Sequence, residues 1–420
     1  MKKAISKTKQ QALQQFKDHV SSAKADFFSQ LGMDMVMGKR EGATLWDLDD
    51  QKRLFNLHCN GGVFNLGHRN AELRELLIQS LDTYDIGNHH LMSYVRAELA
   101  AILAATMPAD LDYTVFAAGG GEAVDLAIKV ARAWTKRSKI VSAKGGYHGH
   151  TGLAVATGDP KYRQPFGISA DEFVQAPFGD LASLETAMED DTAAVILETI
   201  PATIGIVIPP AAYLNAVREL CDQKGSLLIL DEVQTGLGRT GKLWGFEHFD
   251  VVPDMVVLGK GLSGGLYPIA ATVLRTPLEQ VFHADPFIHI STFGGAELGC
   301  CIAKRVVEIS ADPVFLERVN NLAQTFARYV DALRNKFPDF LIGFRQLGLM
   351  MGLVFAGDFS GPMVTKTAYD NDLLMIYANN DTRVCQLLPP LIMEPEQVPW
   401  IMARLEKAIG SAYEQLGGTN

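Results

Sequence analysis

Short apolar runs alternate with helix-like segments along much of this chain, and this alternation constrains the fold more than any other feature. The apolar runs occupy residues 113–116, 140–141, 194–197, 227–230 and 255–258. Runs of this length bounded by Gly and Pro are typical of buried strands, and strands separated by helices pair in parallel. We therefore predict an α/β fold from residue 69 to about residue 270, with a mostly parallel sheet covered on both faces by helices.

The pattern changes toward both ends of the 420 residues. After about Pro313 we expect a long helix at 315–337, strands at 349–355 and 384–388, and a closing helix at 394–416. Ahead of the alternating region we expect a polar helical stretch at 5–30 and a hairpin joining 44–49 to 53–57. We predict a large domain over 61–310, a small α+β domain over 311–420, and an N-terminal segment over 1–60 that joins the small domain.

Charge and apolar content exclude several classes of partner. The formal net charge is −10 and no basic tract occurs, which argues against a nucleic-acid partner. Residues 1–17 lack the apolar core of a secretory signal, and no apolar stretch reaches the roughly 18 residues that span a membrane. The five cysteines show neither zinc-site nor redox spacing. The sequence therefore predicts a cytoplasmic protein without a membrane partner.

Two of the apolar runs end in residues that carry chemistry. Lys260 follows the run at 255–258, and Asp231 follows the run at 227–230. The carboxyl ends of parallel strands meet at one edge of the sheet, so the amine and the carboxylate are expected there together. A desolvated lysine can form a Schiff base, and a carboxylate can hold a proton on the ring nitrogen of pyridoxal 5'-phosphate (PLP). The alternative, a solvated lysine and a helix-capping aspartate, would be favoured if the lysine stood alone.

A phosphate cradle and an aromatic ring accompany these two residues. The glycines at 119–121 precede a helical pattern in which Ala123, Leu126 and Ala127 share one face. Free backbone N–H groups at such a helix N-terminus bind phosphate, although a glycine turn that needs only a positive φ would look the same. Tyr147 follows the run at 140–141, and its flat ring could cover one face of a flat cofactor.

Two other motifs do not fit a ligand site. His148 and His150 have no third ligand at helical spacing nearby, so we predict no metal. Residues 236–241 match the string GxGxxG of dinucleotide-binding proteins. That motif requires a strand before it and a helix after it, and residues 242–246 do not show a helical pattern. We interpret the match as accidental.

Taken together, these motifs resemble the class III aminotransferases, PLP enzymes of fold type I. The resemblance runs from about Gly42 to the end of the chain and includes Asn-Leu-Gly-His at 65–68, Gly-Gly-Glu-Ala at 120–123, Tyr-His-Gly at 147–149, Asp-Glu-Val-Gln-Thr-Gly at 231–236, Pro-Asp at 253–254, Lys260, Ser-Thr-Phe-Gly-Gly at 291–295 and Leu-Pro-Pro-Leu at 388–391. It implies a mostly parallel seven-stranded sheet in a large domain, a small α+β domain, PLP as cofactor and a homodimer with active sites at the interface.

The resemblance also implies roles for single residues. Lys260 would form the Schiff base and later move protons, while Asp231 would pair with the pyridinium nitrogen. The remaining cofactor contacts that it implies are Gln234 near the phenolic oxygen, Tyr147 stacked on the ring, the backbone N–H groups of Gly120 and Gly121 on the phosphate, and Thr292 on the phosphate of the partner subunit.

The chain departs from the family pattern at positions that bind substrate. Members that act on α-amino acids usually carry an arginine three residues before the Pro-Pro pair, but Gln386 stands there, and strand alternation does not ensure that Arg383 points the same way. Where members that use 2-oxoglutarate often have a gating glutamate, this chain has Thr203. The usual proline after Glu198 is also missing, and Ala-Glu at 296–297 replaces the common Asn-Pro.

Several reactions remain open after these departures. Without an arginine clamp and a gate, we favour elimination by an ammonia-lyase on a short amino alcohol bearing phosphonate or phosphate, because a lyase needs no acceptor clamp. The alternative is an aminotransferase that passes the amino group of a small primary amine to pyruvate or another 2-oxo acid. An aminomutase or epimerase is less favoured. A catalytically dead regulator or scaffold of the same fold is disfavoured because Lys260, Asp231 and Tyr147 are intact.

The substrate contacts are predicted from the family geometry alone. Gln386 and Thr203 are expected in the substrate pocket, together with His89 and His90. The two histidines could bind an anion or cap a helix, and the sequence favours neither.

Overall fold

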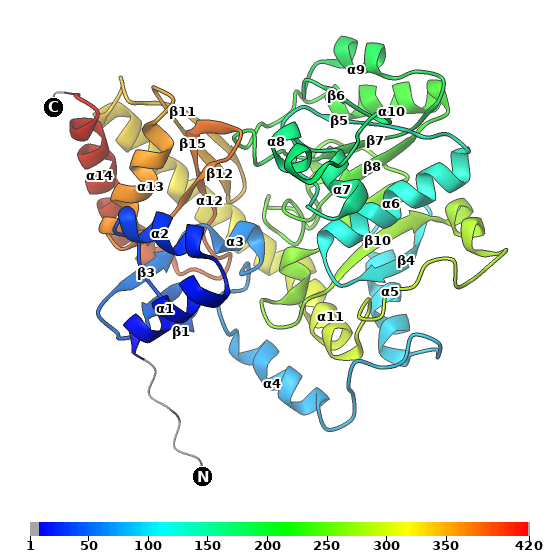
Figure 1. Cartoon of the computed structure of the whole chain (residues 1–420), viewed down its shortest axis with the longest axis horizontal. Helices are drawn as coiled ribbons and strands as arrows, with labels where there is room; N and C mark the ends of the chain where they lie inside the picture. The colour runs from blue at the N-terminus through cyan, green and yellow to red at the C-terminus, as the bar shows by residue number, and fades with distance from the viewer. Residues whose placement is uncertain (1–7, 419–420) are drawn as a thin grey trace.

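A seven-stranded sheet forms the centre of the larger of two bodies in the computed structural model, which describes residues 8–418 (Figure 1). The strand order is β4-β10-β9-β8-β7-β5-β6. The bounds are β4 (Leu111–Ala117), β5 (Lys139–Ala143), β6 (Phe173–Ala176), β7 (Thr192–Glu198), β8 (Leu227–Asp231), β9 (Met255–Leu258) and β10 (Ala270–Arg275). β10 runs antiparallel to both of its neighbours, whereas β5 to β9 pair in parallel. The mostly parallel α/β fold is confirmed, although β6 and β10 were not foreseen as strands.

Both faces of this sheet are buried, as its near-continuous apolar strands require. Alternate side chains of a strand point to opposite faces. Ala194 and Ile196 of β7 pack in the core cluster beneath α6 (Gly120–Thr135), whereas Val195 and Leu197 pack in the cluster of the other face. That second cluster includes side chains from α5 (Tyr94–Ala105), α10 (Tyr213–Lys224) and α11 (Glu297–Ala311).

The smaller body holds the C-terminal part of the chain and its N-terminal strands (Figure 1). One sheet has the order β11-β12-β15-β14, with bounds β11 (Leu341–Leu347), β12 (Met350–Phe355), β14 (Ile376–Ala378) and β15 (Asp381–Leu387). The other has the order β1-β2-β3-β13, with bounds β1 (Met37–Glu41), β2 (Thr44–Asp47), β3 (Arg53–Asn56) and β13 (Leu373–Leu374). The predicted hairpin is present as β2 and β3.

Helices of the smaller body close its core. α12 (Pro313–Lys336), α13 (Ser360–Asp370) and α14 (Val398–Gln415) contribute buried side chains to one cluster, which also contains Phe55 and Leu57. Phe55 and Leu57 therefore share a core with the C-terminal helices, and the division of the chain into domains at residues 60 and 310 stays a prediction. The remaining elements are α3 (Cys59–Gly62), α4 (Ala71–Ser80), α7 (Gly152–Ala156), α8 (Pro160–Arg163), α9 (Leu181–Ala187) and the 3-10 turns η1 (Gln164–Phe166), η2 (Gly245–His248), η3 (Lys260–Ser263), η4 (Thr276–Phe282) and η5 (Pro395–Gln397).

Two expected helices differ in extent from the observed ones. The stretch predicted at 5–30 forms two helices, α1 (Lys9–His19) and α2 (Ser22–Gln30), and residues 5–7 lie outside the described part. Extended Ser21 separates them and caps α2, because its side chain accepts from the backbone N–H of Lys24. The closing helix begins at Val398, after η5. Between residues 8 and 418, no helix is long and apolar enough to cross a membrane.

Candidate active site

A cavity of about 160 Å³ opens where five strands of the large sheet end. Its lining comes from the segments that follow β4, β5, β7, β8 and β9, as expected for an open α/β sheet. The lining residues are Gly120, Gly121, Tyr147, His148, Gly149, Glu198, Ile200, Thr203, Asp231, Val233, Gln234, Thr235 and Lys260. Every residue predicted to contact the cofactor within one subunit is therefore present, together with Thr203 of the predicted substrate contacts.

Lys260 has an environment that suits a reactive amine. Its Nζ donates to Oε1 of Gln234 at 2.9 Å, and its backbone has a φ of 43°, which is uncommon for lysine. Burial lowers the pKa of Lys260 below its ordinary value, although the charges of Asp231 and Glu198 oppose the shift. A lysine with a lowered pKa has a larger neutral fraction, and the neutral amine is the nucleophile.

Asp231 ends β8 and is buried against His148. Its Oδ2 lies 2.8 Å from His148 Nδ1, and its Oδ1 accepts the backbone N–H of Val233 at 3.0 Å. Burial alone would lower the pKa of His148, but the hydrogen bond and charge of Asp231 outweigh it and raise that pKa. From the sequence, His148 was considered only as a metal ligand, and its pairing with Asp231 was not predicted.

Glu198 is a second buried carboxylate of the cavity that the predicted site did not include. It ends β7, and its two oxygens accept the backbone N–H groups of Tyr147 at 2.9 Å and Ala202 at 3.3 Å. Burial raises the pKa of Glu198 to about 7, with His148 opposing the shift and Asp231 adding to it. The signal that pointed to Asp231, an acid at the end of an apolar run, was equally present here.

The first turn of α6 provides the predicted anion cradle. Gly119 is its N-cap and has no side chain to occupy the free N–H groups of the turn. A Cβ on Gly119 would meet no atom within 4 Å, so the space in front of the turn is open, whereas one on Gly121 would lie 2.8 Å from Thr151 Oγ1. Nε2 of Gln234 is buried without a protein partner in the described part of the chain. A lysine amine, a carboxylate, an unpaired amide donor and a phosphate cradle fit PLP.

The other predicted contacts lie outside this cavity. His89 and His90 lie in an exposed loop with their ring centroids 4.2 Å apart, and Thr292 lies in a second loop. Gln386 is buried in β15 but does not line the cavity. Arg383 is exposed and paired with Asp381, so it does not substitute for a clamp. Thr292 was predicted to serve a partner subunit, and that role stays a prediction.

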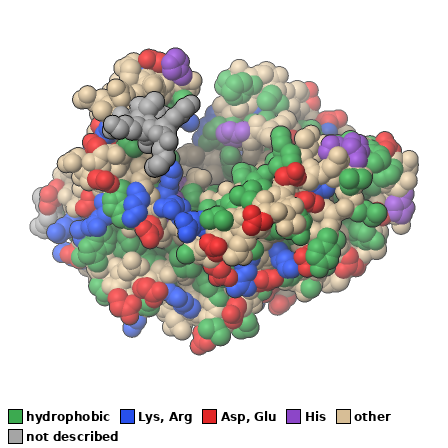
Figure 2. Space-filling model, turned by 90° about the horizontal axis from the view of Figure 1, so that it is seen from below, with side chains coloured by type: hydrophobic (Ala, Val, Ile, Leu, Met, Phe, Trp, Pro, Cys, Tyr) green, Lys and Arg blue, Asp and Glu red, His purple; other side chains and the backbone are tan. Residues whose placement is uncertain are grey.

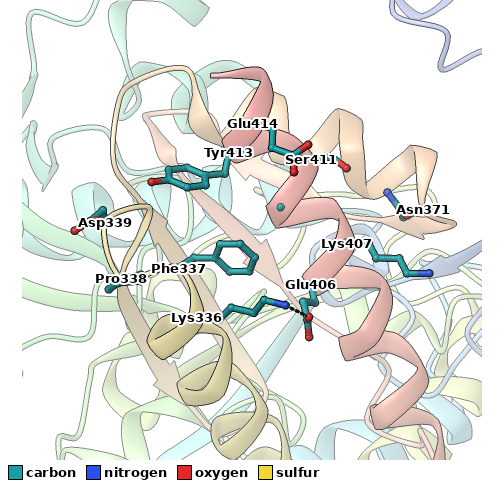
Figure 3. Close-up of a pocket in the computed structure, with 11 residues that line it drawn as sticks. Lys336, Phe337, Pro338, Asp339, Asn371, Glu406, Lys407, Ser411, Tyr413 and Glu414 are labelled. Carbon is teal, nitrogen blue, oxygen red and sulfur yellow. Dashed lines mark hydrogen bonds and ion pairs between the residues drawn. The ribbon is translucent and has the colours of Figure 1, made fainter. Parts of the chain in front are cut away.

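Other features do not compete with this cavity. A groove of about 770 Å³ between the C-terminal ends of α12 and α14 is larger, but it lies away from the strand ends, and Lys336 pairs with Glu406 there (Figure 3).

The GxGxxG segment forms turns followed by the short η2, so no strand–turn–helix unit surrounds it, as we interpreted from the sequence. On the face in Figure 2, basic and acidic side chains are interspersed. No group of three metal-binding side chains occurs within residues 8–418.

Known proteins are similar to this chain over nearly its whole length. A family model described as Aminotransferase class-III matches residues 29–409. An uncharacterized aminotransferase of Archaeoglobus fulgidus is 52% identical over 407 residues, which are 97% of this chain and 96% of that protein. A putrescine aminotransferase of Pectobacterium atrosepticum is 33% identical over 428 residues, covering 98% and 90%. A Toxoplasma gondii ornithine aminotransferase, solved with partial occupancy of PLP at its active site, has a TM-score of 0.88 and 26% identity, covering 98% and 96%.

Proposed function

Because this chain belongs to the class III aminotransferase family and is a PLP-dependent enzyme of the aminotransferase type, we propose that it moves the amino group of a small primary amine to a small 2-oxo acid such as pyruvate. The observation that carries this proposal is the convergence of Lys260, Asp231 and Gln234 on one cavity in front of the α6 N-terminus. When bound, PLP supplies the aldehyde that takes up the amine and the ring that makes its neighbouring C–H acidic.

The protein groups have separate tasks in this reaction. Lys260 holds the cofactor and afterwards moves a proton at its Nζ, where the lowered pKa favours the neutral base. Asp231 would accept a hydrogen bond from the protonated ring nitrogen of the cofactor, and the contact of its Oδ2 with His148 Nδ1 holds that carboxylate in place. The backbone N–H groups of Gly120 and Gly121 bind the phosphate. Tyr147 covers the ring and limits the access of water.

The residues that line the cavity favour an amine substrate that carries no anionic group at the end remote from its reacting nitrogen. Among the lining residues, all within the described part of the chain, Lys260 is the only lysine and no arginine occurs, whereas Asp231 and Glu198 are both carboxyl groups. A carboxylate or phosphonate at the far end of the amine would find no guanidinium among these lining residues. We therefore propose neutral monoamines or diamines as donors. The putrescine aminotransferase among the relatives supports a diamine.

Elimination, which the sequence analysis favoured, stays untested. The arguments for elimination were the missing arginine clamp and the missing gating glutamate. An aminotransferase that uses a small 2-oxo acid as acceptor is equally compatible with the loss of both residues. Gln386 does not reach the cavity lining, and the Thr203 hydroxyl donates to the carbonyl of Gly145 at 2.9 Å. Amino transfer is preferred because the relatives at 52% and 33% identity are both named aminotransferases.

We propose that the working unit is a homodimer. Apolar side chains are exposed on the two loops that carry His89, His90 and Thr292, namely Ile86, Leu91, Met92, Phe287, Ile288, Ile290 and Phe293. The rings of His90 and Phe287 lie 5.3 Å apart and connect the two loops. Exposed apolar patches of this kind are typical of protein interfaces, and a second copy would bring Thr292 to its partner's cavity.

The test is single-turnover chemistry on purified holoenzyme with diamines, monoamines, amino acids and amino-alcohol phosphates or phosphonates. Each amine is mixed first without and then with pyruvate, while free ammonia and the cofactor spectrum are followed. The proposal predicts one equivalent of carbonyl product from a diamine or monoamine, with turnover resuming only when pyruvate is added. Many equivalents of ammonia without any 2-oxo acid would overturn it in favour of a lyase.

A further inference from the structure

The turn between β14 and β15 connects the smaller body to two cavity segments of the larger body, the loop at 144–150 after β5 and the segment after β7 that contains Thr203. Asn380 in this turn donates its backbone N–H to the carbonyl of Thr203 at 2.9 Å and its Nδ2 to the carbonyl of Gly145 at 2.7 Å. Its Oδ1 accepts from Lys161 Nζ of α8 at 2.5 Å. One residue of the smaller body therefore contacts two segments that follow strands of the large sheet, the one with Thr203 through its backbone and the one with Gly145 through its side chain.

The carbonyl of Gly145 fixes the backbone two residues before Tyr147. It accepts from the Thr203 hydroxyl as well as from Asn380. Gly145 has a φ of 76°, and a Cβ there would lie 2.7 Å from Ile204 Cγ2, so the loop has little room for another conformation. On the far side of the loop, the backbone N–H of Tyr147 is held by Glu198. The position of the tyrosine ring thus depends on bonds at both ends of this short segment.

Lys161 of α8 binds the same turn through two hydrogen bonds. In addition to Oδ1 of Asn380, it donates to the carbonyl of Asn379 at 3.2 Å. Its Nζ also lies over the ring of Tyr162 at 4.9 Å. Tyr162 continues an aromatic column, since the centroids of Tyr147 and His150 are 5.2 Å apart and those of His150 and Tyr162 are 4.9 Å apart. Lys161 therefore joins the turn to the column that begins at Tyr147.

We propose that Asn380 is a positioning residue that sets the Tyr147 ring over the cofactor by holding the carbonyl of Gly145, with Lys161 fastening Asn380 in place. This inference rests on the proposed role of Tyr147. The placement of the stacking ring then depends on the contact between the smaller body and the loop that carries Gly145, because the hydrogen bonds of Asn380 form that contact.

The test compares Asn380→Ala with Asn379→Ala. Asn379 is the adjacent residue in the same turn, is exposed, and contributes only its backbone carbonyl to the contacts in the described part of the chain. Amide hydrogen exchange of residues 144–150 is measured on the cofactor-free protein, and the visible circular dichroism of bound cofactor and the KM and kcat for the amine are measured on holoenzyme. We expect exchange to be faster and KM to be higher by about tenfold in Asn380→Ala, from the loss of the neutral hydrogen bond to Gly145 and the charge-assisted one from Lys161. A changed dichroism band is expected with it, and wild-type values in Asn379→Ala.

Each result decides the question. Equal exchange in the two variants, or a lower melting temperature of Asn380→Ala without change in dichroism and KM, would overturn the proposal. If Asn380→Ala does not fold, Lys161→Met decides, because it keeps an apolar stem at Tyr162 and removes only the ammonium; wild-type exchange and KM in that variant would overturn it. The exchange measurement needs neither cofactor nor substrate, so failure of the proposed reaction is distinguishable from failure of the proposed positioning role of Asn380.

Discussion

Lys260 combines three features that a surface lysine lacks. Its φ of 43° is unusual for a residue with a side chain, its Nζ is bonded to Gln234, and burial lowers its pKa. Strained backbone persists where the surrounding structure enforces it, and such positions cluster at active sites. The strain was invisible in the sequence, where Lys260 was notable only for its place after an apolar run.

Replacing this lysine tests the assigned role. Lys260→Ala is expected to lower activity by at least about 100-fold, the lower bound for losing a positioned acid–base group. Borohydride reduction followed by mass spectrometry of peptides should label Lys260 in the wild type and nothing in the variant. Lys24→Ala, on exposed α2, is the matched control and should keep both label and activity. Retained labelling at another lysine in Lys260→Ala would contradict the assignment.

Glu198 makes stability depend on pH in a direction opposite to that of a paired surface acid. Its ordinary pKa is 4.5 and its folded pKa is about 7, so between these values the folded state holds a proton that the unfolded state has lost. The free energy of unfolding therefore falls as pH rises through this window, by at most about 3.5 kcal/mol at about 1.4 kcal/mol per pKa unit.

Glu198→Gln removes this titration. We expect the free energy of unfolding of the variant minus that of the wild type to rise between pH 4.5 and 7 and to stay constant above pH 7. The amide can also change stability by an amount that does not depend on pH, so only the trend with pH is compared. Urea denaturation at pH 5 and pH 8 measures the change, and Glu185→Gln on exposed α9 should show no such trend. A difference that is independent of pH would show that Glu198 is already ionised at pH 5.

At the scale of the element, the first turn of α6 provides the phosphate cradle on one side and packs closely against the start of α7 on the other. The helix places free N–H groups toward the cavity, and Gly121 lies against α7 so closely that a Cβ would come within 2.8 Å of Thr151 Oγ1. Glycine is needed here for close approach and not for a positive φ. The same triple glycine was, in the sequence, compatible with a simple turn.

Gly121→Ala should therefore weaken cofactor binding. Overpacking of about 1–3 kcal/mol would push the first turn or Thr151 aside and lower the affinity for PLP by about tenfold or more. The dissociation constant is measured by fluorescence quenching of cofactor-free protein. Gly152→Ala on neighbouring α7 is the control, since a Cβ there meets no atom within 4 Å. Equal affinity in both variants would show that the cradle tolerates a side chain.

At the scale of the whole molecule, the exposed apolar loops argue for a second copy. Sedimentation of the wild type should give twice the mass of the chain, and Ile288→Lys should shift the equilibrium toward monomer because a charge would be buried at the interface. We expect the monomer to lose activity, since Thr292 would no longer reach its partner's cavity. Phe359→Lys, which is exposed on the smaller body, should leave the mass unchanged. A wild-type monomer with full activity would contradict the dimer.

Local pattern was sufficient for the α/β class, the strands at 227–230 and 255–258, and the residues that carry chemistry at their ends. Apolar runs and glycine clusters report burial and turns within a few residues of themselves, so they identify Lys260 and Asp231 without any long-range contact. The family resemblance rests on the same local strings. Strand β10 was missed because it begins at Ala270, where the predicted alternating region ends, and its antiparallel direction is not visible because a buried strand has the same pattern in either direction.

The three-dimensional arrangement was needed wherever a property depends on a distant partner. Burial of Glu198 and the pairing of His148 with Asp231 arise only when separate strands converge, because a pKa responds to what lies nearby in space. The bond from Asn380 to Gly145 joins two bodies that are far apart along the chain, and no periodicity encodes it. Gln386, expected in the pocket from its place in the sequence, is buried in β15 outside the lining, since the packing of the smaller sheet decides which side chains reach the cavity.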